Sequence, residues 1–471
     1  TGNDASNNVA VGYQALKVVT DGDTNVAVGS LALREVTTGI HNVGVGANAL
    51  DAVQTGTRNT ALGMNSASGT TSSGGVFIGY YAGVSANVDN VVIIGRDAGT
   101  GVTGTGNIAI GYTALAVHTT GVRNIAIGEG AMDDTDAGST SLGSGDNVFL
   151  GYSSGGGTWT DVASNYNIAI GNYTLDDALD GALNNIAIGH SNLGVLTTGD
   201  NNVAVGSSAG ASITTGINNV AVGSNALDAV STTTRNTAVG TGAGGATTGT
   251  GNVFIGNYSG SASNTDNAVI IGRDAGENLT GGGTVAIGYQ AGNLLTSGAN
   301  NTIIGYDADV DANDRAGCIV IGKGLSLNTA SDNVVEIGNN TNSMTYDLDG
   351  GDITVTSDVR TKKNIQDTKL GLEFINKLRP ITYETKPSSE YPKEFGIKEP
   401  SEKSSGKTWD GLIAQEVKKA MDEMNVEFSG WEEGVNTKQR LAYGKFVMPL
   451  IKAVQQLSTR IDELEKQLED K

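Results

Sequence analysis

The chain has 471 residues, of which 69 are glycine and only 5 are proline, and its formal net charge is −21. Residues 1–350 contain 9 Lys and Arg against 29 Asp and Glu, whereas residues 351–471 contain 20 against 21. A strongly acidic first part argues against nucleic-acid binding, which requires a basic surface. No apolar run reaches the length of a membrane-spanning helix, and no secretory signal is visible, so no membrane insertion is expected. The chain begins at Thr1, which indicates a fragment of a longer polypeptide.

Residues 1–340 consist of a short repeat whose core is Asn-Val-Ala-Val-Gly, as in Asn8–Gly12 and Asn202–Gly206. The residue three before the glycine is Val, Ile or Thr in every copy, the residue one before it is Val, Ile or Leu, and the residue between them is Ala or Gly in twelve copies. This alternation predicts one short strand per copy, ended by a glycine that needs special backbone angles or a close approach. The glycine occurs twenty times, mostly 16 or 17 residues apart, at positions 12, 29, 46, 63, 79, 95, 111, 128, 151, 171, 189, 206, 223, 240, 256, 272, 288, 305, 322 and 338.

A second apolar stripe follows each glycine by three to four residues, as in Ala32-Leu33, and predicts a second short strand. A unit this short cannot bury its own apolar face, so the copies are expected to stack into a parallel β-solenoid. Fourteen copies have Asn four residues before the glycine, and stacking would align them in a ladder of side-chain amides. With about 4.8 Å per coil, the rod would be about 95 Å long. Trimerisation would bring the Val and Ile stripes together near a common axis.

A longer repeat overlies the short one. The eight glycines from Gly12 to Gly128 recur from Gly189 to Gly305 with a shift of 177 residues. Residues match as well, as in the identical stretches Ile94–Gly99 and Ile271–Gly276. A block of about ten coils is therefore inferred to be duplicated. Residues 7–340 resemble the head repeats of trimeric autotransporter adhesins, which implies a left-handed parallel β-roll in a homotrimer.

The repeat is irregular between Gly128 and Gly171, where the spacing widens to 23 and then 20 residues. This widening predicts a lateral loop or bulge. An alternative interpretation is a carbohydrate-contacting patch made of Tyr152, Trp159 and Tyr166. Aromatic faces stack on sugar rings, and the nearby carboxylates accept hydrogen bonds from sugar hydroxyls.

Four oxygen-bearing residues in Asp307–Asn313 have the spacing of the start of a calcium loop. Ala312 stands where such a loop needs glycine, and Cys318 stands where it needs a carboxylate, so a solvated acidic turn is expected. No metal site and no cofactor are predicted. Cys318 is expected to be a small buried residue in a strand. The histidines, which are assigned no catalytic role, are His41, His118 and His190.

The composition changes at Ser357, beyond which all five prolines lie. Residues 341–356 predict a β connector or tip, and residues 357–471 predict a small α+β domain. Within it we expect a helix over 370–378, a strand over 381–384, a polar loop over 386–407, and a strand that becomes a helix over 409–424. A final helix over 443–470 carries apolar residues at heptad spacing, which predicts a coiled coil, and a trimeric rod favours three strands. The heptad residues are Tyr443, Val447, Leu450, Val454, Leu457, Ile461, Leu464 and Leu468.

Several stretches of this last region carry a second resemblance. They are Ser357-Asp358-x-Arg360-x-Lys362-x-Asn364-Ile365, Leu378-x-Pro380-x-x-Tyr383, Gly411–Val417, Tyr443 and Leu450–Ala453. They resemble the endosialidase-type C-terminal intramolecular chaperone of phage tail fibres and tailspikes. The resemblance covers about residues 357–471 and implies a domain that trimerises, sets the register of the upstream fibre and then cuts itself off. Gln415 stands where members of that family carry a histidine.

The resemblance implies a cut between Thr356 and Ser357, with Ser357 as nucleophile and Lys362 as general base. Asp358 and Arg360 would pair and position the loop. A serine hydroxyl needs a base within hydrogen-bond reach, and a lysine serves when desolvation lowers its pKa. The alternative interpretation is a surface turn with incidental serine and lysine. At most, then, the chain is a single-turnover peptidase.

Together these features predict a mainly β protein, a trimeric solenoid of about twenty coils followed by a small α+β domain and a coiled coil. The predicted function is a structural and host-adhesion component of a phage tail fibre, located in the virion. Its partners would be two further copies of the chain, other tail proteins, and a glycan or protein receptor on the host cell. The alternatives are a bacterial trimeric surface adhesin with the same chaperone, and a tailspike polysaccharide depolymerase.

Overall fold

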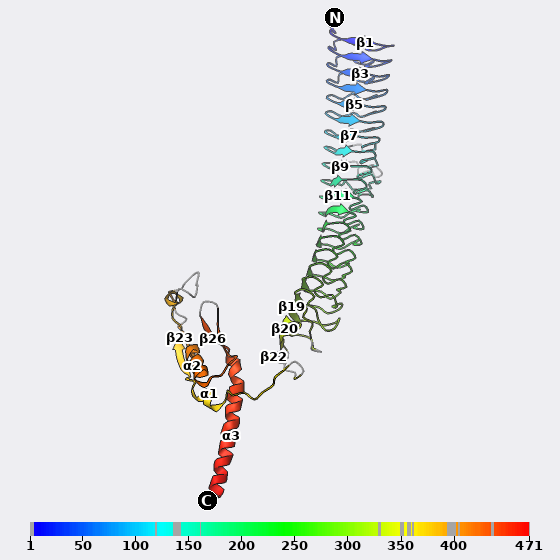
Figure 1. Cartoon of the computed structure of the whole chain (residues 1–471). Helices are drawn as coiled ribbons and strands as arrows, with labels where there is room; N and C mark the ends of the chain where they lie inside the picture. Colours follow the sequence, from blue (N-terminus) through cyan, green and yellow to red (C-terminus); the bar gives the residue numbers. More distant parts are fainter. Residues whose placement is uncertain are drawn as a thin grey trace. The chain divides into compact units, whose positions relative to one another are not determined.

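A computed structural model shows two compact units, Thr1–Thr356 and Ser357–Lys471. The first unit is a stack of coils, and the second is a small mixed domain with a long helix (Figure 1). The structure describes the whole chain except residues 1–3, 118–119, 135–142, 161, 328–330, 349–352, 356–358, 360–361, 393–401, 404–405, 435–437 and 471.

The first unit is a parallel β-solenoid in which each coil contributes one short strand. Strands β1 and β2 pair in register, with Val9 opposite Val26 and Val11 opposite Val28. The same parallel pairing continues coil by coil to β20, which confirms the predicted solenoid. The strands are β1 (Val9–Val11), β2 (Val26–Val28), β3 (Val43–Val45), β4 (Thr60–Leu62), β5 (Val76–Ile78), β6 (Val92–Ile94), β7 (Ile108–Ile110), β8 (Ile125–Ile127), β9 (Val148–Leu150), β10 (Ile168–Ile170), β11 (Ile186–His190), β12 (Val203–Ser207), β13 (Val220–Val222), β14 (Thr237–Val239), β15 (Val253–Ile255), β16 (Val269–Ile271), β17 (Val285–Ile287), β18 (Thr302–Ile304), β19 (Ile319–Lys323) and β20 (Val334–Asn339).

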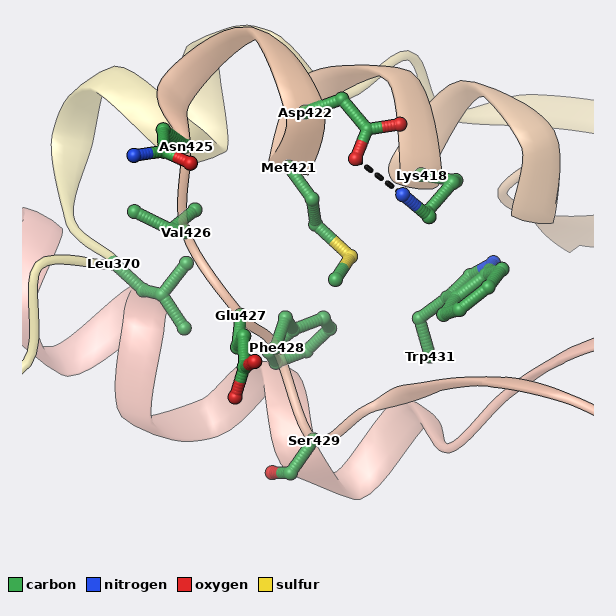
Figure 2. A pocket seen from close by; sticks show the side chains of 10 residues that line it. All are labelled: Leu370, Lys418, Met421, Asp422, Asn425, Val426, Glu427, Phe428, Ser429 and Trp431. Atoms are coloured by element: carbon green, nitrogen blue, oxygen red, sulfur yellow. Dashed lines mark hydrogen bonds and ion pairs between the residues drawn. The ribbon is translucent and has the colours of Figure 1, made fainter.

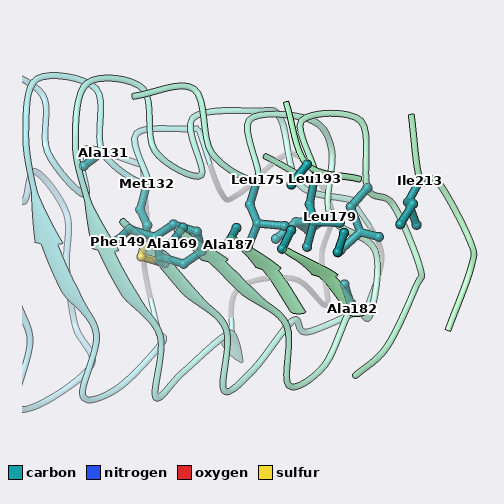
Figure 3. Close-up of a cluster of buried hydrophobic side chains, with 14 of the residues drawn as sticks. Ala131, Met132, Phe149, Ala169, Leu175, Leu179, Ala182, Ala187, Leu193 and Ile213 are labelled. Carbon is teal, nitrogen blue, oxygen red and sulfur yellow. The ribbon is translucent and has the colours of Figure 1, made fainter. Parts of the chain in front are cut away.

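In strands β2 to β19 the second residue is buried inside the coil, and the residues on either side of it are more exposed. In β2, Ala27 is buried while Val26 and Val28 are half-buried. The buried middle residues form one continuous core along the rod, part of which is drawn in Figure 3 around Phe149 and Leu175. The outward Val and Ile residues form an apolar stripe that is only half covered within a single chain.

Two positions of each coil share the volume of the core. In several coils with a small middle strand residue, such as that of Ala27, the fourth residue after the closing glycine is a buried leucine, here Leu33. Where the middle residue is large, as at Phe77, that fourth residue is a glycine, Gly83, and a Cβ added to it would collide with the Phe77 ring. Close packing of protein interiors requires this exchange, because a coil this thin has no room for two large residues.

The prediction of a second strand after each glycine is wrong. Those residues form turns, and Leu33 and Leu50 adopt φ angles of 49° and 51°. These angles lie in the left-handed region, which is incompatible with an extended strand. Ala32 and Leu33 are fully buried. The stripe is therefore apolar because it lines the core of a tight turn.

The asparagines form the predicted ladder inside the rod. The backbone N–H and side-chain Nδ2 of Asn42 both donate to Oδ1 of Asn25, each at 3.0 Å. Nδ2 of Asn42 also donates to the carbonyl of Gly56 at 2.9 Å. The same bonds recur further along, as between Asn219 and Asn202. Every rung satisfies buried polar groups that would otherwise be costly, so the ladder holds adjacent coils in register.

The closing glycines have the special geometry that the repeat predicts. Gly29 has a φ of 139°, and a Cβ added to it would collide with the carbonyl of Gly46 in the next coil. A side chain would therefore force adjacent coils apart.

The last strands of the first unit leave the parallel stack. Strand β21 (Ser343–Asp347) pairs antiparallel with β20, and β22 (Ile353–Val355) pairs antiparallel with β21. This short meander occupies the connector that the sequence predicts for residues 341–356.

The second unit has a small apolar core and two short antiparallel sheets. The core includes Phe374, Met421 and Phe428. The elements are α1 (Leu372–Asn376), β23 (Ile381–Glu384), η3 (Ser388–Glu390), β24 (Thr408–Gly411), α2 (Ala414–Met424), β25 (Trp431–Glu433), β26 (Gln439–Leu441), η6 (Tyr443–Phe446) and α3 (Val447–Glu469). Elements α1, β23, β24, α2 and α3 agree with the predicted helices and strands to within a few residues, whereas η3, β25, β26 and η6 were not predicted. No helix in the described part of the chain is long and apolar enough to cross a membrane.

Candidate functional site

The predicted cleavage site lies at the boundary between the two units. Thr356, Ser357, Asp358 and Arg360 are outside the described residues, so the serine–lysine pair stays a prediction. Lys362 is described and exposed, and its backbone N–H donates to the carbonyl of Val359 at 3.1 Å.

The chain that follows this boundary is attached to helix α3. The Nζ of Lys452 lies 3.4 Å from a carboxylate oxygen of Asp367. The backbone N–H of Leu372, at the start of α1, donates to Oε1 of Gln456 at 2.7 Å. Since α1 has no side-chain cap of its own, Gln456 satisfies one of the free N–H groups at its start. Helix α3 thus holds the first structured segment of the second unit.

Helix α3 has a second face that its own unit leaves open. Pro449 and Ala453 are buried against the rest of the unit. The heptad residues of the adjoining face are exposed large hydrophobics, namely Val447, Leu450, Val454, Leu457, Ile461, Leu464 and Leu468. An uninterrupted heptad face of this kind is the contact surface of a coiled coil.

Tyr443, the first of the predicted heptad residues, precedes helix α3 itself. It lies in the 3-10 turn η6, because α3 begins only at Val447. Its hydroxyl accepts a hydrogen bond from the backbone N–H of Leu412 at 2.8 Å. Tyr443 therefore links the start of the helix to the residue after β24. Single-sequence periodicity cannot separate these roles, because the residue has the correct spacing for both.

Two further contacts join the motif residues of the second unit. Arg379 forms an ion pair with Glu416 of α2 at 2.5 Å. The hydrogen bond from Arg379 lowers the pKa of the Glu416 carboxyl, and both side chains are partly exposed. Lys377 pairs with Glu423 at 2.9 Å. These pairs fasten the end of α1 to α2.

Residues 357–425 match the family model Peptidase_S74, described as the chaperone of endosialidase. The match extends from the predicted cleavage site to the end of α2, and it supports an intramolecular chaperone role for the second unit. Neither the comparison with curated proteins nor the comparison with solved structures returned a match.

A pocket of about 990 Å³ opens beside α2. Figure 2 shows the side chains of Met421, Phe428 and Trp431 around it, with Lys418 and Asp422 at its edge. Lys418 forms an ion pair with Asp422, and its Nζ lies 5.4 Å from the centre of the Trp431 ring. The charges at this edge are therefore neutralised by one another. Among the described residues of the chain, no cluster of three or more side chains could hold a metal ion.

The structure corrects the predicted sugar-contacting patch in the irregular coils. Trp159 is fully buried, and its ring packs against Phe149 with the ring centres 5.7 Å apart. Because no face of its indole is exposed, Trp159 cannot stack on a ligand and is a core residue. Tyr152 and Tyr166 are exposed. Tyr166 lies beside the Arg123–Asp146 ion pair, whose charged groups are 2.6 Å apart.

Sequence reasoning missed the residues that do lie beside Tyr152. The ring of Tyr173 is 5.2 Å from that of Tyr152, and the ring of His190 is 5.8 Å from that of Tyr173. The signal was present in the repeat. Tyr152 and His190 each follow a closing glycine directly, and Tyr173 is the second residue after Gly171. Residues that directly follow the closing glycines of adjacent coils are neighbours in space.

The acidic turn around Asp309 is less solvated than predicted. Burial raises the pKa of the Asp309 carboxyl to about 6. Its two oxygens accept hydrogen bonds from the backbone N–H groups of Leu294 and Val310, at 2.7 and 2.8 Å. Asp311 pairs with Arg315 at 2.7 Å. The carboxylates of Asp309 and Asp311 are thus bound by backbone N–H groups and by Arg315 of the chain itself.

Cys318 is buried, as predicted. It occupies the ladder position of its coil, and its backbone N–H donates to Oδ1 of Asn301 at 2.9 Å. Burial raises the pKa of the thiol, which keeps it in the unreactive protonated form.

Proposed function

We propose that this chain is a homotrimeric adhesion rod whose second unit is an intramolecular chaperone. In this proposal the chaperone aligns three chains, and the chain is then cut between Thr356 and Ser357. The observation that carries the proposal is the open heptad face of α3, from Val447 to Leu468, in a unit whose first part matches the chaperone family.

The solenoid explains why such a chaperone is useful. Adjacent coils meet through nearly the same strand, ladder and glycine contacts along the whole rod, so a shift of one coil between chains changes few contacts. Strand register is weakly specified in such a case. Three chains whose C-terminal helices are already joined enter the stack at a common level, and the slow parallel assembly starts from one end.

The proposed cut is a single-turnover reaction of the chain on itself. The hydroxyl oxygen of Ser357 attacks the carbonyl carbon of Thr356 while Lys362 accepts the hydroxyl proton. The peptide C–N bond breaks, the nitrogen of Ser357 takes a proton, and an ester joins the two parts. Water then hydrolyses the ester, which releases the second unit and restores the hydroxyl. Removal of the chaperone would make the assembled rod kinetically hard to unfold.

Intact-mass measurement of the wild-type chain and of Ser357→Ala tests the cut. We expect two products from the wild type, with a break after Thr356, and one uncut chain from the variant. A wild-type chain that stays whole after trimerisation refutes the cleavage step.

Refolding tests the chaperone step separately. A chain truncated after Thr356 should fail to form trimers after dilution from denaturant, whereas Ser357→Ala should form them. Sedimentation velocity distinguishes monomer from trimer. A truncated chain that refolds to a trimer as efficiently as the full chain contradicts the chaperone role.

A phage tail fibre is the setting that the proposal favours, with the rod in the virion and a receptor on the host cell. The support for this setting is the resemblance of residues 357–471 to the chaperones of tail fibres and tailspikes. A bacterial surface adhesin with the same chaperone is the second candidate. Purified rods that block phage adsorption to the host would support the first, and detection of the chain on the bacterial surface without phage would support the second.

A further inference from the structure

Three rings form an exposed aromatic column where the repeat loses its regular spacing. The column consists of Tyr152, Tyr173 and His190, which come from three consecutive coils. The ring planes meet at 76° and 78°, so the neighbours are in edge-to-face contact. Tyr152 and Tyr173 are 43% and 41% exposed, and His190 is exposed as well. Edge-to-face packing covers less of each ring face than parallel stacking does, which leaves apolar ring surface open to solvent.

The column differs from a second aromatic column further along the rod. There Tyr289 lies between Arg273 and Tyr306: the Arg273 guanidinium is 4.6 Å from its ring centre, and the Tyr306 ring is 5.0 Å away and nearly parallel. Both faces of Tyr289 are thus covered by neighbours in adjacent coils. That arrangement stabilises the stack but leaves no face for a ligand.

A carboxylate stands beside the exposed column. Asp176 follows Tyr173 by three residues, and a Cβ added to Gly156 would lie 3.1 Å from its Oδ1 and 3.3 Å from the Cα of Ser153, the neighbour of Tyr152. Burial, the neighbouring Tyr152 and the charge of Asp176 raise the pKa of the Tyr173 hydroxyl. Burial and the nearby Asp133 raise the pKa of Asp176 itself to about 6. The two aspartates come from coils on either side of Gly156, and Asp176 is half-buried. A side chain at Gly156 would crowd the Asp176 carboxylate, so the glycine leaves room beside it.

The surrounding charge limits the class of ligand. Residues 1–350 carry 29 acidic against 9 basic residues, and the residues beside the column are aspartates. An anionic polymer would be repelled by this surface. A neutral hydroxylated ring presents C–H groups to an aromatic face and donates hydroxyl hydrogen bonds to a carboxylate, which is what the column and Asp176 offer together.

From this placement we propose that Tyr152, Tyr173, His190 and Asp176 form a binding site for a neutral hexose-containing glycan. The rings of the column contact the apolar faces of successive sugar residues, and Asp176 accepts hydrogen bonds from their hydroxyls. The three coils span about 10 Å, which suits a short run of sugars along the rod. This assignment rests on the proposed adhesive function and names the ligand class for it.

The test uses the full chain and four neutral probes: maltohexaose, cellohexaose, mannohexaose and galactohexaose. Saturation-transfer NMR identifies the probe that binds, and calorimetry gives its Kd. We expect at least one probe to bind, and we expect Tyr173→Ala and Asp176→Asn each to weaken it by about tenfold, the loss typical of one hydrogen bond to a charged group or one aromatic contact. Polygalacturonate oligomers should bind more weakly than the neutral probe.

The chain offers matched controls at equivalent positions of regular coils. Tyr258, like Tyr173, is the second residue after its glycine, is exposed and has a positive φ of 53°. Asp228, like Asp176, is the fifth residue after its glycine, and burial raises the pKa of its carboxyl. Tyr258→Ala and Asp228→Asn should leave the Kd unchanged.

Three results overturn the assignment. The first is a wild-type chain that binds none of the neutral probes. The second is an equal loss of affinity in the control variants and in the site variants. The third is a loss of trimer in Tyr173→Ala with unchanged affinity in the trimer that remains. The last result would make the column a contact between chains. A wild-type trimer that adheres to host cells but binds no probe refutes this assignment alone. A trimer that adheres to no cells refutes the proposed adhesive function.

Discussion

The exchange of core volume between two positions of a coil allows a sharp test of the fold. Phe77→Ala removes a fully buried ring, and large-to-small changes of this kind cost about 3–5 kcal/mol. Gly83→Leu alone should also destabilise, because its Cβ would collide with the Phe77 ring. In the double variant the leucine enters the space of the missing ring, as Leu33 does beside Ala27. The double variant should be more stable than Phe77→Ala by about 1–2 kcal/mol. This figure is the free energy gained by burying a leucine minus the cost of placing it in a left-handed backbone conformation.

Hydrogen exchange measured by mass spectrometry is the suitable assay, because a rod of repeated coils opens locally and need not unfold in one step. We expect faster exchange in coils β4 to β6 for each single variant and a return toward wild-type protection for the double variant. The reasoning is refuted if the two effects are additive, with the double variant less protected than both single variants. The pair Phe254 and Gly260 provides an independent repetition in the duplicated block.

Three further predictions concern the heptad face, the ladder and a buried carboxyl. Leu457→Asp should abolish the trimer in sedimentation velocity, because it places a charge on the proposed coiled-coil contact. Asn202→Ala should destabilise its coils by about 1–3 kcal/mol in hydrogen exchange, since Asn219 loses an acceptor inside the core. Asp309 has a pKa raised to about 6, above its value in the unfolded chain, so its charge destabilises the fold at neutral pH and this penalty disappears as the pH falls from 6 to 4. Asp309→Asn should remove that component from the pH dependence of the melting temperature.

Each of these predictions has a control and a result that contradicts it. Thr459→Asp changes the charge of α3 outside the heptad face, and equal trimer loss in both variants would deny the heptad a special role. An Asn202→Ala rod with wild-type protection would show that the ladder is not needed for register. If wild type and Asp309→Asn have parallel pH profiles between pH 4 and 6, burial of Asp309 does not influence stability.

The strand of each coil could be predicted from sequence because its pattern has a single structural explanation. Val, Ile, Leu or Thr on both sides of one middle residue before a glycine, repeated twenty times with a small middle residue in twelve copies, leaves few folds other than a solenoid. The ladder followed from the same periodicity, because stacking brings equivalent positions together. The prediction of a second strand was wrong. The residue types of Ala32 and Leu33 show that these positions are apolar, but they do not show which backbone angles the residues adopt. A buried leucine at a positive φ contradicts ordinary propensities, and only the tightness of the coil requires it.

The candidate sites were predicted less completely. Trp159 stands alone in a coil of irregular length, so nothing in its neighbourhood distinguishes an inward from an outward ring. Whether it fills the core depends on the space beside Phe149, which sequence does not reveal. Tyr443 has correct heptad spacing but lies before the helix begins. Tyr173 could have been found by comparing the first two residues after the closing glycine in adjacent coils, and not by searching for aromatic residues near one another in sequence.

The line of closing glycines also has a consequence for how such a rod changes length. Because the carbonyl of one glycine comes so close to the next glycine, as at Gly29 and Gly46, each coil presents the same upper and lower surface to any other coil. A block of coils can therefore be inserted or removed without creating a new kind of junction, which the 177-residue duplication illustrates. A single recombination event can therefore double or halve the length of the rod, while helix α3 stays the same.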